Sequence, residues 1–359
     1  MENRERDILL DVVRGFAMVC VVLGHCIQEG SGLVFSENTF YFQDRVYQFL
    51  YSFHMPLFML ISGYFAWKSV DQAETIVDRW KMLYRKCAYL LVPIFGWGLI
   101  DQMNAYIQNQ IKHYQLLPKY LLQNAIVYIL TNLWFLWAIL ICFLLVCMMH
   151  YIFRDTIWMY AGIFIIMFVT PDGLGLGVYK YMVPYYLIGF YFHRYLEKAE
   201  KEPVWKDWHI NRKVNFYLLL ISGAMFFLLF LLFEEKYFIY LTGYKLLGKQ
   251  MMEQLWIDGY RFLIGFMGSI FFVMLLSLIM YVKKNGVWNN MLAFIGQKSL
   301  GIYILSGYVI MYVVRNLAAD LKPNYFMNII ECIGVLILSV ILYAVIEKIP
   351  YMKKLIGVK

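Results

Sequence analysis

Residues 8–28 decide the fold, and they read ILLDVVRGFAMVCVVLGHCIQ. The run is about as long as the roughly 20 residues that an α-helix needs to cross a bilayer. It lacks the alternation of apolar and polar residues that strands of a membrane barrel show. It nevertheless contains Asp11, Arg14 and His25. The run therefore predicts a membrane-spanning helix that carries polar groups within the membrane.

The composition of the chain extends this prediction to all 359 residues. Hydrophobic residues make up 62% and charged residues only 16%, against roughly 45–50% and about 25% in soluble domains. The 30 tyrosines, 28 phenylalanines and 10 tryptophans exceed what one soluble core could bury. These values exclude a soluble globular enzyme, a disordered chain and a fibrous repeat. They predict an all-α, polytopic bundle of transmembrane helices.

Apolar runs of suitable length predict about ten spans and one arrangement of them in the membrane. With the N-terminus in the cytoplasm, 21 of the 32 Lys and Arg residues fall on the cytoplasmic side and 10 outside, as the positive-inside rule requires. Both termini are then cytoplasmic. We expect one domain over 1–359, with no appended soluble domain, in the inner (cytoplasmic) membrane. The expected spans are 8–28, 46–67, 87–107, 133–153, 156–171, 179–195, 214–233, 262–282, 299–316 and 325–347.

The first span places its polar residues on one helical face. Asp11 and Arg14 are three residues apart and can pair. Arg14 and His25 are eleven apart, which is three turns plus roughly 20°, or about 16 Å along the axis. Charges inside spans usually face the bundle interior and serve function. In the plainer alternative, Arg14 reaches the inner headgroups and His25 lies at the outer interface.

The second span carries Phe53-His54-Met-Pro56-Leu-Phe58, followed by Ser62-Gly63-Tyr64. Because this span runs antiparallel to the first, His54 is expected in its outer half and Ser62 in its inner half. A Ser-Gly pair more often allows close helix packing than catalysis. His54 could contact a substrate or bond backbone groups freed by Pro56.

Several of these motifs resemble the family-3 membrane acyltransferases. The segments 11–17 and 22–25, with an Arg, ten residues and a His, resemble the opening signature of that family. Residues 53–64 are similar to its second-span motif, and Leu133-Trp134-Phe135-Leu136 resembles a third. Ser299-Leu-Gly-Ile-Tyr303 and Glu347-Lys348-Ile-Pro350 resemble the last two spans. The matches follow the expected order from residue 8 to residue 350.

The resemblance implies a membrane enzyme that moves an acyl group, most often acetyl, from cytoplasmic acyl-CoA to a hydroxyl of an envelope glycan or glycolipid. Its catalytic pair then falls on Arg14 and His25. Two positions depart from the family, because Asn132 and Ser306 stand where many members have His. We expect these changes to alter the acceptor pocket, in which the resemblance also places Tyr303. Polysaccharide O-acetylation is the corresponding process.

The chemistry of acyl transfer assigns roles to the pair. A neutral imidazole can act as general base toward the acceptor hydroxyl, so His25 is predicted to do so. Arg14 remains charged when buried and could hold the phosphates of the donor, line the path of its pantetheine arm, or brace Asp11. No metal cluster is present in the sequence, so acetyl-CoA is expected as co-substrate without a metal.

Other residues complete the candidate site, each with a plainer alternative. Arg85, Lys86 and Arg194 could contact the donor, or could anchor the helices at the basic inner face. Trp134 could stack on a sugar or belong to the interfacial aromatic belt. Asp101 and Glu331 could contact the acceptor or be structural carboxylates. The predicted substrate-binding set is Asp11, His54, Ser62, Arg85, Lys86, Asp101, Trp134, Arg194, Tyr303, Ser306 and Glu331.

Two other classes of protein share this composition. An exporter or flippase of a glycan or lipid-linked intermediate would use the polar face of the first span as its pathway. A scaffold in an export complex leaves the buried Arg14 and His25 unexplained. The net charge of +8 is accounted for by basic cytoplasmic segments facing anionic lipid. We therefore expect the lipid bilayer, the acyl donor and the acceptor as partners and no nucleic acid, and we leave homo-oligomerisation open.

Overall fold

The computed structural model describes residues 7–29, 40–111, 118–153, 156–170, 172, 176–244, 251–283, 286–317 and 324–358, and these form helices without any strand. The all-α prediction is confirmed. The helices are α1 Ile8–Glu29, α2 Arg45–Asp71, α3 Ile76–Ile111, α4 Pro118–Thr131, α5 Trp134–Phe153, α6 Ile157–Val169, α7 Leu176–Lys198, α8 Arg212–Leu231, α9 Ile239–Thr242, α10 Met251–Val282, α11 Val287–Gln297, α12 Ser299–Val309, α13 Arg315–Leu317 and α14 Tyr325–Ile346.

Each of the ten expected spans falls on a helix. Within the described residues, seven segments are both long and apolar enough to cross a membrane: α1, α2, α5, α8, α10, α14 and the run from Ser299 to Leu317. In that run a π-helical segment, Ile310–Val314, joins α12 to α13. The other three expected spans lie in α3, α6 and α7. Polar residues lower the hydropathy of α3 and α7, and α6 has only 13 residues.

Two boundaries predicted from the sequence are wrong. Helix α10 begins at Met251 rather than at residue 262, because its first turns are polar on one face and the hydropathy pattern starts late. Residues 287–297, expected to belong to a connection, form α11. Both corrections bear on the site, since they add buried polar contacts at its two ends.

The outside of the bundle is apolar. Helices α8 and α14 expose large hydrophobic side chains along their length, which a soluble protein would leave as a patch prone to association. In a bilayer such faces meet lipid, and the helical backbone satisfies its own hydrogen bonds. The molecule is therefore a multi-pass membrane protein. The exposed side chains on α8 include Phe216, Tyr217, Leu220, Ile221, Phe227 and Leu228.

Helix α1 packs against α11 at backbone distance. A Cβ added to Gly15 would lie 1.9 Å from the carbonyl oxygen of Leu292, and one added to Gly296 would lie 1.8 Å from that of Asp11. Only glycine permits this approach, as is common where membrane helices meet. The contact holds the inner half of α1, with Asp11 and Arg14, at a fixed position.

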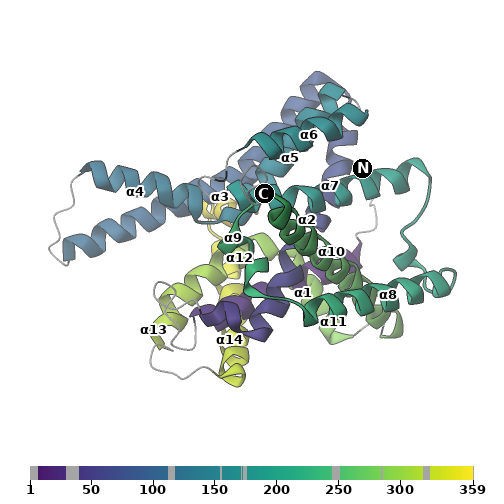
Figure 1. The fold of residues 1–359 in the computed structure, drawn as a ribbon. Coiled ribbons are helices and arrows are strands. Elements are labelled where there is room, and N and C mark those ends of the chain that lie inside the picture. Colours follow the sequence, from purple (N-terminus) through teal and green to yellow (C-terminus); the bar gives the residue numbers. More distant parts are fainter. Residues whose placement is uncertain are drawn as a thin grey trace.

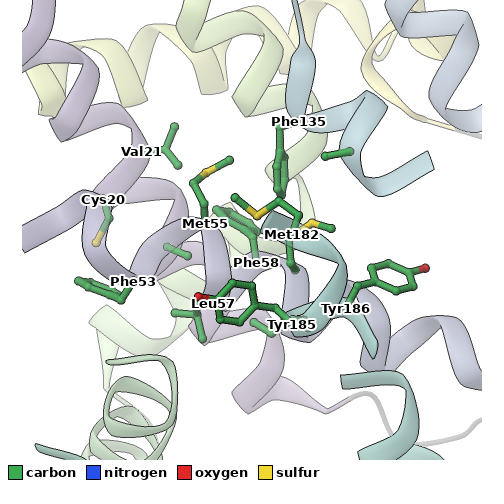
Figure 2. Packing of buried hydrophobic residues seen from close by; sticks show 14 of the residues in the cluster. Cys20, Val21, Phe53, Met55, Leu57, Phe58, Phe135, Met182, Tyr185 and Tyr186 are labelled. Atoms are coloured by element: carbon green, nitrogen blue, oxygen red, sulfur yellow. The ribbon is translucent and has the colours of Figure 1, made fainter. Parts of the chain in front are cut away.

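Helices α2 and α7 make a second contact of the same kind. A Cβ on Gly63 would lie 2.0 Å from the carbonyl oxygen of Tyr186, and one on Gly189 would lie 1.9 Å from that of Leu60. Gly63 thus has the packing role that the sequence favoured for the Ser-Gly pair. Figure 2 shows side chains of α1, α2, α5 and α7 interleaved in the core beside this contact, with Met55, Phe58 and Phe135 near its centre.

Helices α3 and α4 form a hairpin that extends away from the other helices (Figure 1). Its base is held by polar contacts to α12, which are described below. The remaining long helices surround α1 and α2. The polar residues of α1 and α2 therefore lie inside the bundle, where Asp11 and His54 are 2% and 1% exposed.

Because the backbones of α2 and α7 touch, we expect one added methyl group at Gly189 to lower the stability of the protein strongly. We expect Gly189→Ala to lower the free energy of unfolding by about 1–3 kcal/mol, because the added Cβ overlaps a backbone carbonyl that has no room to move. Thermal unfolding in detergent measures the change. Gly334→Ala in α14 is the matched control, since nothing lies within 4 Å of its added Cβ. Equal midpoints for the two variants would contradict the packing described.

Candidate functional site

The N-terminal half of α1 presents Arg14 to α2. The guanidinium carbon of Arg14 lies 4.3 Å from the centroid of the Phe65 ring, a cation–π contact. Asp11, one turn earlier, accepts a hydrogen bond of 3.2 Å from Nε2 of Gln297, which is the last residue of α11. Tyr89 of α3 lies within electrostatic range of Arg14. Arg14 is thus held among α1, α2 and α3.

The C-terminal half of α1 presents His25. Its Nδ1 lies 3.2 Å from Oε1 of Gln28, and the Gln28 side chain is buried and also bonded to Tyr41. With the amide oriented so that its oxygen faces the ring, Nδ1–H donates, and Nε2 of the neutral imidazole keeps its lone pair. Gln28 therefore sets His25 up to accept a proton at Nε2. Sequence reasoning missed Gln28, although its spacing of three residues was a signal.

His54 lies close to His25 but uses one of its nitrogens locally. Nδ1 of His54 donates to the carbonyl oxygen of Leu50 at 2.6 Å, one turn earlier in the same helix as Pro56. Leu50 is not the residue whose carbonyl Pro56 frees, because the N–H that Pro56 lacks would have bonded the carbonyl of Ser52. The two histidines lie within electrostatic range of each other, and the ring of Tyr51 packs edge-on against His54 at 4.6 Å.

A continuous line of aromatic rings begins beside His25, and we name it the aromatic row. It meets α1 at Gly24, where an added Cβ would lie 2.8 Å from the Tyr51 ring. The row crosses from α2 through α9 and α5 to α12. Successive centroid separations are 5.1 Å for Tyr41–Tyr47, 4.0 Å for Tyr47–Tyr51, 6.4 Å for Tyr51–Tyr240, 6.1 Å for Tyr240–Trp134, 5.9 Å for Trp134–Phe135 and 6.0 Å for Phe135–Tyr303.

The aromatic row includes two of the predicted acceptor contacts, Trp134 and Tyr303. Ser306, another residue predicted to affect the acceptor pocket, is buried one turn beyond Tyr303. Its hydroxyl donates to the Tyr303 carbonyl at 3.0 Å. Ser306 therefore has a local backbone partner in α12. The structure brings Trp134 and Tyr303 to the end of α1 that carries His25.

Asp101 occupies a separate polar cluster at the base of the α3–α4 hairpin. Its Oδ2 accepts hydrogen bonds from the hydroxyls of Tyr128, at 2.5 Å, and Tyr308. Asn132, where the family often has His, donates to the same oxygen at 3.4 Å. Partners from α4, α12 and the α4–α5 junction thus surround the carboxylate. Asp101 joins these elements to α3.

Glu331 differs from Asp101 in the hydrogen bonding of its carboxylate. Both carboxyl oxygens are shielded from solvent and have no hydrogen-bond partner among the described residues. Glu331 belongs to α14 and lies within electrostatic range of Cys26, the neighbour of His25. A buried, unpartnered polar group calls for an explanation, and a substrate hydroxyl would supply a partner.

The predicted donor contacts Arg85 and Lys86 belong to α3, and Arg194 belongs to α7. Nζ of Lys86 in α3 lies 5.5 Å from the centroid of the Phe143 ring. The guanidinium carbon of Arg194 in α7 lies 5.5 Å from the Tyr191 centroid and 5.8 Å from that of Trp67. Arg85 is exposed, and Ser62 is partly buried beside Gly63. Lys86 and Arg194 thus lie over aromatic rings.

Two buried ion pairs were missed from the sequence. Arg261 and Asp258 in α10 are 2.6 Å apart, with side chains 2% and 5% exposed. Lys180 of α7 lies 2.5 Å from Asp172. Hydropathy placed the start of the eighth span at residue 262, so Arg261 fell just outside it, whereas Lys180 fell at the start of the sixth span. The i,i+3 spacing of Asp258 and Arg261 was the available signal.

The structure and the motifs together define a class: a helical membrane protein with an Arg–His pair on one buried helix. Comparison with known proteins gives the family. The family model described as an acyltransferase domain (acyltransferase family 3) matches residues 7–348. The chain belongs to this family of acyltransferases, and the resemblance in its motifs is confirmed. Among the described residues, no three His, Cys, Asp or Glu side chains gather in a way that could hold a metal ion.

Two curated relatives carry the name nodulation protein NolL. That of Sinorhizobium fredii is 31% identical over 198 residues, which are 54% of this chain and 50% of the relative. That of Mesorhizobium japonicum is 25% identical over 230 residues, which are 62% of this chain and 56% of the relative. The matched region thus spans little more than half of either relative. No solved structure matches the chain.

The Asp101 cluster predicts that Asp101 and Tyr308 do not contribute independently to the free energy of unfolding. We expect Tyr308→Phe to lower the free energy of unfolding by about 1.5–3 kcal/mol, because its hydroxyl donates to a charged acceptor. In an Asp101→Leu background the same substitution should cost much less. A double-mutant cycle from thermal unfolding isolates this term, with exposed Tyr84→Phe as control. An equal cost in both backgrounds would show that the carboxylate does not hold Tyr308.

Proposed function

We propose that this protein is an O-acetyltransferase that moves an acetyl group from cytoplasmic acetyl-CoA to a hydroxyl of an envelope glycan or glycolipid. The observation that carries the proposal is the arrangement along α1. Arg14 and His25 share one helical face about 16 Å apart, and Gln28 leaves Nε2 of His25 available as a base. Membership of the acyltransferase family supports the reaction type.

The proposed reaction needs one proton transfer at His25. As the acceptor oxygen attacks the thioester carbonyl, Nε2 of His25 takes the hydroxyl proton. The C–S bond then breaks, and the proton passes to the departing CoA sulfur, so that acceptor and acetyl-CoA become acetylated acceptor and free CoA. The Nδ1 contact with Gln28 keeps the ring oriented and disperses the positive charge that forms on it.

The donor is proposed to enter from the end of α1 that carries Arg14. The separation of Arg14 and His25 is comparable to the reach of a pantetheine arm, so phosphates near Arg14 would place the thioester near His25. Lys86, Arg85 and Arg194 lie in the inner halves of neighbouring helices and can contribute positive charge. Arg14 binds phosphate better than a lysine could, because its guanidinium offers several fixed donors.

The acceptor is proposed to bind at the opposite end. Trp134 and Tyr303 of the aromatic row can pack against a sugar, and Glu331 offers two unpartnered oxygens for its hydroxyls. The excess of Lys and Arg on one side of the predicted spans supports cytoplasmic termini and therefore an outer acceptor site. The inner membrane is the compartment in which a cytoplasmic donor and an exported acceptor meet.

Acetyl transfer by purified protein in nanodiscs tests the proposal. We expect CoA release from acetyl-CoA that depends on added acceptor extract from the producing cells. His25→Ala should abolish it, and Arg14→Lys should raise the KM for acetyl-CoA. The control is exposed Trp158→Leu in α6, 67% exposed, which should behave as wild type. Movement of the acceptor across the bilayer without CoA release would instead support an exporter.

Gln28 gives a finer test of the proposed base. Gln28→Leu removes the acceptor of the Nδ1–H bond, so the ring loses its preferred tautomer and orientation. We expect kcat to fall by about 10- to 100-fold, part of the 10²–10⁴ that a general base contributes, with little change in KM for acetyl-CoA. Gln28→Glu, which keeps an acceptor oxygen, should retain most activity. Equal kcat for the Leu variant and wild type would show that Gln28 does not position His25.

A further inference from the structure

The segment of residues 234–244, which joins α8 to α10, reaches the aromatic row, and we name it the strap. It contains a short 3-10 turn, Glu235–Tyr237, and the one-turn helix α9. Tyr240 of α9 fills the position between Tyr51 and Trp134 in the row. No motif in the sequence pointed to it.

Arg261 holds the strap on both sides of Tyr240. Its Nε donates to the Tyr237 carbonyl at 2.9 Å, its Nη1 to the Gly243 carbonyl at 2.8 Å, and its Nη2 to the Thr242 hydroxyl. Asp258 balances its charge at 2.6 Å. One buried guanidinium thus fixes the backbone before and after α9.

A second anchor holds the end of the strap. The carbonyl of Tyr244 accepts from Nζ of Lys180 at 2.8 Å, and its N–H donates to Asp172 at 2.7 Å. Gly243 turns the chain between the two anchors with φ 65° and ψ −164°, a conformation that essentially only glycine adopts. The position of Tyr240 is therefore set by the tertiary structure.

Tyr240 keeps part of its surface accessible although several other tyrosines surround it. Its side chain is 44% exposed, and the hydroxyls of Tyr41, Tyr51, Tyr181 and Tyr303 all lie within electrostatic range of it. These tyrosines come from different elements. Their hydroxyls converge near the end of α1 that carries His25, and the ring of Tyr51 connects them to Gly24.

The aromatic rings and hydroxyls around Tyr240 favour one chemical class of ligand. Aromatic faces pack against apolar C–H surfaces, and phenol hydroxyls can both donate and accept hydrogen bonds. Nearby Arg261 and Lys180 are paired with Asp258 and Asp172, so these two anchors bring no net positive charge to an anion. A lipid tail would leave the hydroxyls unsatisfied. An uncharged ring with C–H faces and several hydroxyls, such as a pyranoside, satisfies both features.

We propose that the strap is the specificity-determining wall of the acceptor site, where Tyr240 stacks on an uncharged pyranose ring and Arg261 acts as the positioning residue. This inference rests on the proposed function, because it takes the bound sugar to be the acceptor that receives the acetyl group. It adds residues that the family motifs do not contain.

Saturation-transfer NMR on the full protein in nanodiscs tests the proposal without requiring turnover. The probes are methyl β-glucoside, methyl β-N-acetylglucosaminide, methyl α-mannoside and methyl α-rhamnoside. We expect at least one to receive saturation on its ring C–H protons from the wild-type protein, and its affinity to fall about tenfold in Tyr240→Leu. Tyr240→Phe should keep most of the effect, because the ring remains. Tyr217→Leu in α8, which removes an exposed tyrosine elsewhere, should match wild type.

Arg261→Lys tests the positioning role. A lysine keeps the charge opposite Asp258 but cannot bond three groups of the strap at once. We expect pyranoside binding to weaken as in Tyr240→Leu, while circular dichroism shows an intact helical fold. Thr242→Val, which removes a single hydrogen bond, should give a smaller loss and serves as the second variant if Arg261→Lys does not fold.

Two results would overturn the proposal: no saturation transfer to any of the four pyranosides from wild type, or equal binding by wild type and Tyr240→Leu. Neither depends on catalysis. If the pyranoside binds through Tyr240 but acceptor-dependent CoA release is absent, the proposed transfer fails and the sugar site stands. If CoA release persists with an unchanged acceptor KM in Tyr240→Leu, the transfer stands and the role of the strap fails.

Discussion

The structure depends on the approach of helix backbones to contact distance at glycine. At Gly15 and Gly296 the inner half of α1 touches α11, and at Gly63 and Gly189 helix α2 touches α7. Lipid tails give apolar helices little reason to associate, so such close packing must supply the association energy. These contacts hold α1 and α2 inside the bundle. Because the two helices are enclosed, their polar side chains are shielded from lipid.

Enclosure gives α1 two chemically different ends. At one end Arg14 lies on Phe65, and cations of α3 and α7 rest on further aromatic rings. At the other end His25 meets Gln28, and the aromatic row begins. An acyltransferase needs a place for its donor and a place for its acceptor. A single helix that carries both groups fixes their separation through its own rise per residue.

Buried charges in this protein mostly organise backbone. Arg261 bonds the strap on both sides of Tyr240, and Lys180 holds the carbonyls of Thr170 and Tyr244. Asp101 gathers hydroxyls from α4 and α12. Inside a membrane, irregular backbone persists only where its polar groups find partners within the protein. The ion pairs therefore permit a non-helical segment to enter the bundle near His25.

The sequence by itself determined the helical membrane class, the ten apolar runs, the family and the Arg14–His25 face. Each rests on local properties: hydropathy, helical spacing and a motif read in order. Only the tertiary structure decided that α11 packs against α1 and that Tyr240 completes the aromatic row. Those contacts join residues distant in the chain, as when Arg45 bonds the Phe233 carbonyl. Spacing along one helix carries no information about which other helix will face it.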